Sequence, residues 1–169
     1  MLEAMMAFLV SAGPIGLFFA SIIAHASLFL PLPVDMILIP LSAVDFFGLG
    51  IITPLLLGII VAFGSSIGEM SGYFVGRAGI GSFEKMKAKE IGQLKILKEK
   101  LEQIGMPLIA FFAFVPLPFD LMGIVCGLSK YSKKKFFVAG FIGRVPRYAI
   151  LAYAGYFGVS FILKFFVGG

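Results

Sequence analysis

The stretch GMPLIAFFAFVPLPFDLMGIVCGLS, residues 105–129, decides the fold, because Pro116, Pro118 and Asp120 interrupt an otherwise apolar run. Each arm beside this break has about 11–16 residues, or roughly 17–24 Å as helix, whereas a spanning helix needs about 20 residues. Proline removes a backbone donor and ends the helix before it, and such a break is tolerated at membrane depth only inside protein or against a water-filled cavity. We therefore predict a re-entrant hairpin with these prolines at its tip; a single kinked helix is the alternative.

The same pattern occurs earlier in the chain. Residues 15–44 are also apolar and are broken at PLPVD, residues 31–35, so that Pro31 and Pro33 form a second predicted tip, 85 residues before PLPFD at 116–120. The fragments GYFVG at 72–76 and GYFG at 155–158 repeat in the same order. Two ordered landmarks indicate an internal duplication within one domain, 1–169, with half one at about 1–81, a linker at 82–104 and half two at about 105–169.

Composition places the chain in a membrane. Its 169 residues are 60% hydrophobic and 14% charged, against about 25% charged residues in soluble domains. We predict an all-α integral membrane protein. The single Cys126 and the lack of Cys/His ligand spacing predict no metal site and no cofactor. The basic residues border apolar spans, which argues against nucleic acid as a partner.

The charge distribution predicts the topology. Residues 1–76 contain no Lys or Arg, and all fourteen lie from Arg77 onward. Under the positive-inside rule, the basic segments 82–104 and 130–135 are cytoplasmic in a multi-pass protein of the plasma membrane. The two hairpins then enter from opposite faces as an inverted repeat, together with full spanning helices at 51–76 and 136–163. Segment 82–104 has helical apolar spacing and is predicted as an amphipathic surface helix, or alternatively as a solvated connecting helix.

Five charged residues inside apolar runs are the candidate functional groups. Each costs at least about 2.5 kcal/mol at a membrane centre, so they are expected to face inward and share one chamber. The carboxylates outnumber the arginines, so at least one lacks a cation and can carry protons. The two arginines on one helix face offer planar forks that suit phosphate oxygens. The predicted proton-coupling residues are Asp35, Glu69 and Asp120, and the predicted substrate-binding residues are Arg144 and Arg147.

Other residues have structural explanations beside the functional ones. Glu69 and Arg144 can form an internal salt bridge that only fixes helix packing. His25 is a candidate proton relay, although a lone histidine is commonly a hydrogen-bonded core residue. The sequence contains no recognisable nucleophile–base pair, so we predict that the protein is not an enzyme. A stripe of small residues on one helix face predicts close helix packing: Gly64, Gly68, Gly72 and Gly76.

Several of these segments resemble the motifs of a known protein family. GSSIGEMSGYFVGRAGIG at 64–81 resembles the acid, Tyr and Gly-Arg signature of the DedA family, also called the VTT-domain or SNARE-associated Golgi protein family. PLPVDMILIPLSA looks like its first loop. The block FVPLPFDLMGIVCGLSKYSKKKFFVAGFIGRVPRYAILAYAGYFG resembles the second, in the form of the YqaA-like branch. The likeness covers roughly residues 15–158.

The resemblance implies two opposed re-entrant loops and a role in lipid transport or scrambling, often dependent on the proton gradient. It also implies a polyprenyl phosphate as one class of substrate. Asp35 stands where the family has a loop acid, and Glu69 stands where it has the acid before the Tyr and Gly-Arg motif. Typical members have arginines around the second loop, where this chain has Ala113 and Phe119. Phosphate recognition would therefore come from the last helix instead.

The preferred prediction is a membrane transporter that moves a lipid or lipid-linked phosphate across the bilayer, coupled to protons, or an uncoupled scramblase with the same chamber. Its expected partners are membrane lipids and protons, with a homo-oligomer plausible at this size. The acids and arginines also permit a small ion or solute–proton antiporter. A non-transporting scaffold for membrane homeostasis, assembled through the glycine stripe, is the third hypothesis.

Overall fold

The computed structural model describes residues 11–26, 34–79, 88–115 and 119–167, and within these it describes only the backbone of 88–98 and 159–167. All regular structure in these ranges is helical, which confirms the predicted all-α class. The elements are α2 (Gly13–Ala26), α3 (Val34–Leu41), η1 (Gly50–Ile52), α4 (Thr53–Gly68), α5 (Met70–Gly79), α6 (Ala88–Phe114), α7 (Asp120–Leu128) and α8 (Lys133–Val167).

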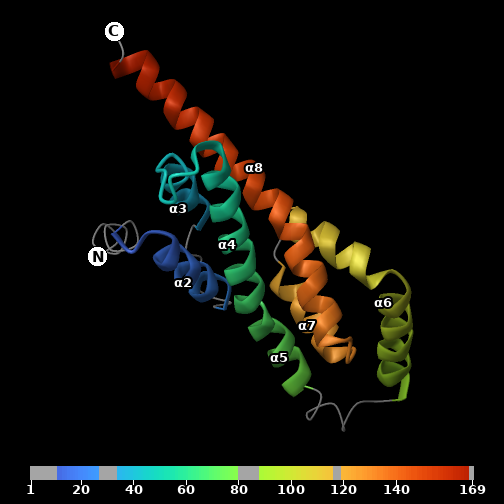
Figure 1. Cartoon of the computed structure of the whole chain (residues 1–169). Coiled ribbons are helices and arrows are strands. Elements are labelled where there is room, and N and C mark those ends of the chain that lie inside the picture. The colour runs from blue at the N-terminus through green and yellow to red at the C-terminus, as the bar shows by residue number, and fades with distance from the viewer. Residues whose placement is uncertain (1–10, 27–33, 80–87, 116–118, 168–169) are drawn as a thin grey trace.

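The two halves of the chain use the same packing pattern (Figure 1). In each half, the helix before the broken segment packs against the long helix of its own half: α2 against α4, and α6 against α8. The helix after the break packs against the other half: α3 against α8, and α7 against α5. The long helices α4 and α8 also pack against each other. The halves are therefore interlocked rather than placed side by side.

Glycines make the cross-half contacts close. A Cβ added to Gly76 of α5 would overlap the backbone of Ile124 in α7, and one added to Gly155 of α8 would overlap the backbone of Ile39 in α3. The two glycines are 79 positions apart, at 76 and 155, and the two isoleucines are 85 apart, at 39 and 124. The isoleucines keep the 85-residue offset of the PLPVD and PLPFD segments, but the glycines do not. The two contacts are therefore alike in kind without joining equivalent positions, and both need a residue without a side chain.

The predicted stripe of four glycines lies at helix contacts along α4 and α5. A Cβ at Gly64 or Gly68 would meet the backbone of α2, and one at Gly76 would meet α7. A Cβ at Gly72 would lie 3.4 Å from the main-chain oxygen of Asp120, which is ordinary van der Waals contact. The stripe therefore allows α2 to pack closely against α4 and α7 to pack closely against α5.

The predicted span 51–76 is present with a local break. The helical run Gly50–Gly79 is the one run among the described residues that is long and apolar enough to cross a membrane, by length and composition. It divides into α4 and α5 at Glu69, where the residue has φ −71° and ψ −11°. The second predicted span, 136–163, lies within α8, whose 35 residues extend for about 50 Å.

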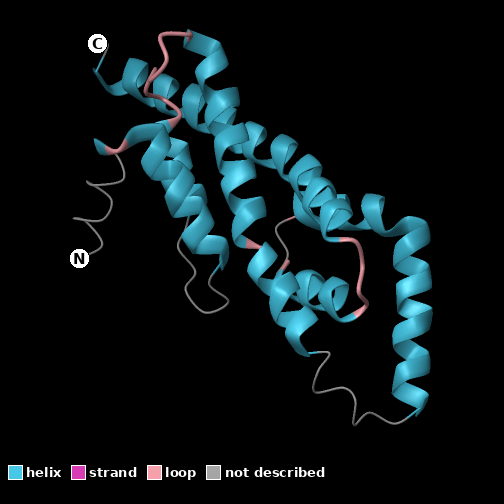
Figure 2. Ribbon diagram, turned by 60° about the horizontal axis from the view of Figure 1, so that its bottom comes forward, coloured by secondary structure: helices cyan, strands magenta, loops and turns pink. Residues whose placement is uncertain are grey.

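Helix α6 differs from the prediction of a separate surface helix at 82–104. It continues from Ala88 to Phe114 through Pro107, so the described part of the linker and the first arm of the second broken segment form one helix. The helix bends partway along, as Figures 1 and 2 show. An internal proline removes one backbone hydrogen bond and accounts for a bend without ending the helix. The predicted tips at Pro31, Pro33, Pro116 and Pro118 lie outside the described residues.

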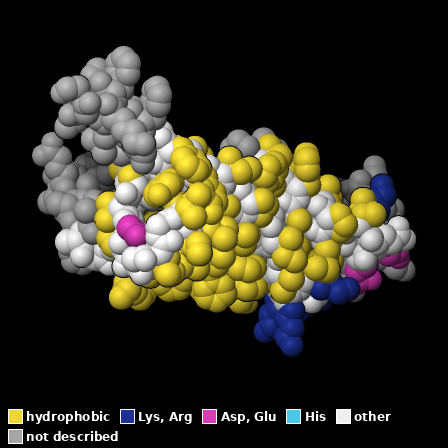
Figure 3. All heavy atoms as spheres, turned by 45° about the horizontal axis from the view of Figure 1, so that its top comes forward, with side chains coloured by type: hydrophobic (Ala, Val, Ile, Leu, Met, Phe, Trp, Pro, Cys, Tyr) yellow, Lys and Arg dark blue, Asp and Glu magenta, His cyan; other side chains and the backbone are white. Residues whose placement is uncertain are grey.

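The surface of the helices is widely apolar (Figure 3). On the face shown, hydrophobic side chains cover the middle of the molecule, and the Lys and Arg side chains lie toward one end. A soluble monomer rarely exposes such a continuous apolar surface. The large exposed hydrophobic side chains include Ile15, Phe19, Phe111, Leu121, Ile142 and Ile150.

The connection from α3 to α4 is organised by Asp45. Its carboxylate accepts the backbone N–H groups of Leu49 at 3.0 Å and Gly50 at 2.9 Å, together with the Thr53 hydroxyl. The Thr53 hydrogen bond, supported by these backbone donors, lowers the pKa of Asp45 below its usual value. The carboxylate of Asp45 therefore fixes the start of α4.

Candidate functional site

The candidate site lies where α8 meets the elements of the first half. Arg144 and Arg147 are three residues apart on α8, so they project from one face of that helix. One guanidinium meets the α4–α5 junction and the other meets α3. The interlocked packing thus brings together acids and arginines that are far apart in the sequence.

The first of these contacts is the ion pair between Glu69 and Arg144, which we call the closed pair. Both residues are buried, with 6% and 2% of their surfaces exposed. The Arg144 guanidinium also stacks over the Phe119 ring, 4.4 Å from its centroid. A buried ion pair is stable only if its two charged groups are well aligned, because no water compensates them. Loss of either partner therefore leaves an uncompensated buried charge. This is the pairing expected if the two residues fix helix packing.

The second contact is the ion pair between Asp35 and Arg147, which we call the open pair. Nη2 of Arg147 lies 3.0 Å from Oδ2 of Asp35. The two side chains are 42% exposed for Asp35 and 22% exposed for Arg147. They line a cavity of about 360 Å³ whose other walls are apolar: Phe114, Val115, Ile150 and Leu151. The open pair is therefore a polar spot on the wall of an otherwise hydrophobic cavity.

A histidine–tyrosine hydrogen bond connects α2 to the arginines. His25 Nδ1 lies 2.8 Å from the Ser21 carbonyl oxygen, so this nitrogen donates and Nε2 is left as an acceptor. The hydroxyl of fully buried Tyr148 donates to Nε2 at 3.1 Å. Tyr148 follows Arg147, whose guanidinium lies 5.3 Å from the Tyr148 ring centroid. His25 also interacts electrostatically with both arginines and with Asp35.

Asp120 occupies a different position from the other two candidate acids. Within the described residues it forms no ion pair with either arginine, and its main chain packs against Gly72 of α5. Its neighbour Phe119 is the residue that stacks on Arg144. The predicted chamber of five charges is thus, in the described part of the chain, two acid–arginine pairs with a third carboxylate outside them.

Sequence reasoning missed two residues of this site. Tyr148 and Phe119 are not among the predicted functional residues, and Phe119 is named in the sequence analysis only at a position where the family has an arginine. The signal for Tyr148 was its position directly after Arg147, which places an aromatic hydroxyl next to a cation inside an apolar run. Across the residues that the structure describes, no group of His, Cys, Asp or Glu side chains is arranged to hold a metal ion.

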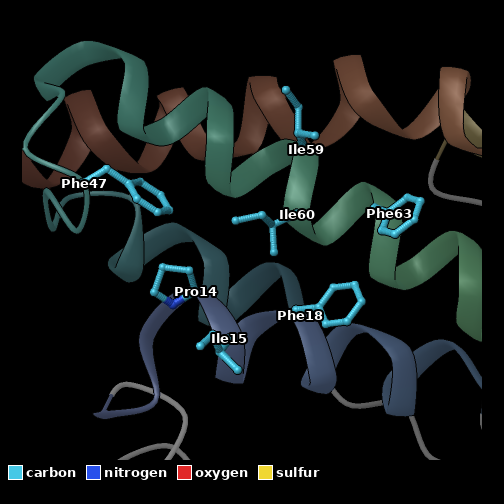
Figure 4. Close-up of a pocket in the computed structure, with 7 residues that line it drawn as sticks. All are labelled: Pro14, Ile15, Phe18, Phe47, Ile59, Ile60 and Phe63. Atoms are coloured by element: carbon cyan, nitrogen blue, oxygen red, sulfur yellow. The ribbon is translucent and has the colours of Figure 1, made fainter.

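A second cavity, of about 490 Å³, lies between α2 and α4 (Figure 4). The side chains drawn in Figure 4 approach it from α2, from α4 and from the loop before α4. All of them are apolar, so this cavity offers nothing that would distinguish one headgroup or ion from another. Its lining residues are Pro14, Ile15, Phe18, Phe47, Ile59, Ile60 and Phe63.

Comparison with known proteins gives one match. The family model described as the VTT domain matches residues 32–157, which are 126 of the 169 residues. Neither the curated proteins nor the solved structures contain a match to this chain. The matched region contains both residues of the closed pair, both residues of the open pair and Asp120, whereas His25 lies before it.

Proposed function

Because the chain belongs to the VTT-domain family, whose members are membrane-associated, we propose that it is a multi-pass transporter of a lipid or lipid-linked phosphate. In this proposal the broken segments are re-entrant hairpins that enter the plasma membrane from opposite faces, as an inverted repeat. The matching packing of the two halves, α2 on α4 like α6 on α8 and α3 on α8 like α7 on α5, supports that arrangement. The basic segments 82–104 and 130–135 lie on the cytoplasmic side.

The observation that carries the proposal is the open pair. Arg147 has the planar fork that binds phosphate oxygens, and it is held 3.0 Å from Asp35 at the wall of a cavity of about 360 Å³. The apolar remainder of the wall suits hydrocarbon. A molecule with an anionic headgroup and an apolar chain therefore fits both the charged and the apolar parts of this site, whereas a small hydrophilic ion fits only the first.

Binding and proton uptake are coupled by exchange at Arg147. When a substrate phosphate takes the guanidinium, Asp35 loses its cation. An unpaired carboxylate beside a bound phosphate and the apolar walls of the cavity is unfavourable, because like charge and apolar surroundings both disfavour the ionised form. Asp35 therefore takes up a proton and becomes neutral. When the phosphate leaves, Asp35 releases the proton and pairs with Arg147 again. The net charge of the site changes little through the cycle, which keeps the cost of each step low.

The remaining charged groups have separate roles in this proposal. The closed pair holds α8 against the α4–α5 junction and so fixes the position of Arg147, three residues further along α8. Asp120 has no arginine partner within the described residues and is the second candidate for carrying a proton. His25 is positioned to pass a proton through its hydrogen bond with Tyr148.

The test is reconstitution into liposomes with a fluorescent phospholipid, in which lipid movement is followed with and without a pH gradient. We expect Arg147→Gln to slow movement at least about tenfold, because it removes a charge-assisted contact of about 1.5–3 kcal/mol. Asp35→Asn is expected to keep lipid movement but to lose its response to the gradient. Lys100→Gln, a change at an exposed residue of α6, is the matched control for removal of one positive charge.

Three outcomes would contradict parts of this proposal. Unchanged lipid movement in folded Arg147→Gln rules out the open pair as the binding site. A gradient response retained in Asp35→Asn removes Asp35 from proton coupling and leaves an uncoupled scramblase. Solute-driven pH changes in the liposomes without lipid movement would instead support the small ion or solute antiporter.

A further inference from the structure

A third cavity lies far along the fold from the open pair, at the end of α5 and the start of α8. It has a volume of about 440 Å³, and four cationic side chains line it: Arg77, Lys130, Lys133 and Lys134. The buried rings of Tyr73 and Tyr131 form its inner wall. These four cations come from α5, from the α7–α8 connection and from α8. The question is why they gather around one cavity.

The backbone of the α7–α8 connection is ordered around this cavity. The N–H of Tyr131 donates to the Cys126 carbonyl at 2.9 Å and the N–H of Lys130 donates to the Gly127 carbonyl at 3.1 Å, which is the Schellman pattern of a helix end. The left-handed residue of this motif is usually glycine, yet here it is Lys130, with φ +56°. The hydroxyl of Tyr73 donates to the Tyr131 carbonyl at 2.5 Å and joins the connection to α5.

In the part of the chain that the structure describes, the charges of this cavity have no compensating ion pair. Within the described residues, none of its four cations pairs with a carboxylate. The first turn of α8 contains Lys133, Lys134 and Lys135 and no acidic residue. A helix N-terminus carries positive partial charge, so lysines there are unfavourable unless an anion lies nearby. Glu102 of α6 acts electrostatically on Tyr131 and leaves a clear excess of positive charge.

Apolar surface adjoins the cavity on α5. Phe74 lines it with 53% of its surface exposed, and the next residue, Val75, is 52% exposed. These side chains point away from the helix core, and they lie on the same helix as Arg77. The cavity therefore has cations on one side and lipid-compatible surface on the other. That combination matches a phosphate attached to a hydrocarbon chain better than a free anion.

We propose that this cavity binds the phosphate of an anionic membrane lipid at the headgroup level of the leaflet next to the basic segments. Lys133 and Lys134 supply charge and N–H donors, together with the free backbone N–H groups at the start of α8. Lys130, whose backbone is in the left-handed conformation, contributes another cation to the cavity wall. Phe74 contacts the first part of an acyl chain. Binding here needs no movement of lipid across the bilayer and is independent of the transport proposal.

Native mass spectrometry of the detergent-purified chain tests this by counting bound dioctanoyl phosphatidic acid, with dioctanoyl phosphatidylcholine as the headgroup control. We expect Lys133→Gln/Lys134→Gln to weaken phosphatidic acid binding at least about tenfold, since two charge-assisted contacts are lost. The control is Lys100→Gln/Lys135→Gln, which removes two exposed charges outside the cavity lining and is expected to change binding less than about twofold.

Two further measurements decide between a lipid and a free anion. Inorganic phosphate at millimolar concentration is expected to displace little phosphatidic acid, because it lacks the acyl contact with Phe74. Full displacement, or equal loss of binding in the two double variants, would overturn the proposal. The variant Lys130→Gly, which is compatible with the left-handed backbone, is expected to keep the fold and to lower phosphatidic acid affinity. Unchanged affinity in that variant would remove Lys130 from the site.

Discussion

The closed pair and the open pair have the same chemistry in different surroundings. Each joins an acid of the first half to an arginine of α8, and the two arginines are three residues apart. Glu69 and Arg144 are buried, whereas the side chain of Asp35 is 42% exposed. A buried pair cannot exchange partners without leaving a charge stranded, and an exposed pair can. On this comparison, we expect exposure to distinguish an ion pair that fixes helix packing from one that can exchange partners.

The strongest way to break this comparison is to remove one side of the closed pair. Arg144→Met leaves Glu69 buried without its cation, and we expect the free energy of unfolding to fall by about 3–5 kcal/mol. The measurement is denaturant unfolding in detergent micelles. Glu69→Leu/Arg144→Met removes both charges and is expected to recover most of the loss. Equal destabilisation of the single and double variants would contradict the pairing.

A smaller effect is expected at the hydrogen bond that connects α2 to the arginines. Tyr148→Phe leaves His25 Nε2 without its donor, which is expected to cost about 1–2 kcal/mol of unfolding free energy. Tyr153→Phe is the matched control, since its hydroxyl donates to the Ile51 carbonyl at an exposed position and its loss can be replaced by water. An equal loss of unfolding free energy in the two variants would show that the buried hydrogen bond stabilises the fold no more than the exposed one.

The smallest effect on stability is expected at the open pair. Measuring it tests directly whether the open pair and the closed pair differ in strength. A double-mutant cycle with Asp35→Asn and Arg147→Gln should give a coupling free energy below about 1 kcal/mol, because solvent screens the pair. The same cycle at Glu69 and Arg144 should give a clearly larger value. Similar coupling at both pairs would show that exposure does not separate their roles.

The sequence predicted the general features of the site better than its detailed pairing. Charged residues at similar depth in apolar runs predicted one chamber that holds Asp35, Glu69, Asp120, Arg144 and Arg147. Four of these form two ion pairs in the described structure, and Asp120 is not among them. Which acid meets which arginine depends on the rotation of α3 and α4 relative to α8. Asp35 and Arg147 are 112 residues apart, and no local pattern encodes that rotation. The bond between His25 and Tyr148 spans 123 residues and was missed for the same reason.

Some helix boundaries differ from those that local sequence features predict. The change from polar residues at 82–104 to apolar residues from 105 onward predicts a boundary at the end of the linker. Helix α6 nevertheless continues past this point and through Pro107 with a bend, because a helix tolerates one missing hydrogen bond. The break between α4 and α5 falls at Glu69, and no proline or charge run marks it in the sequence. The predicted breaks at the PLPVD and PLPFD prolines lie outside the described residues and stay predictions.

The interlocked packing of the two halves has a consequence for biosynthesis. Helix α3 ends at Leu41, and its main partner α8 begins only at Lys133. A ribosome adds about 5–20 residues per second, so α3 waits roughly 5–20 s before α8 leaves the tunnel. During that interval the face of α3 around Ile39 has no partner within its own chain. Insertion machinery or surrounding lipid must shelter that face until the last helix arrives.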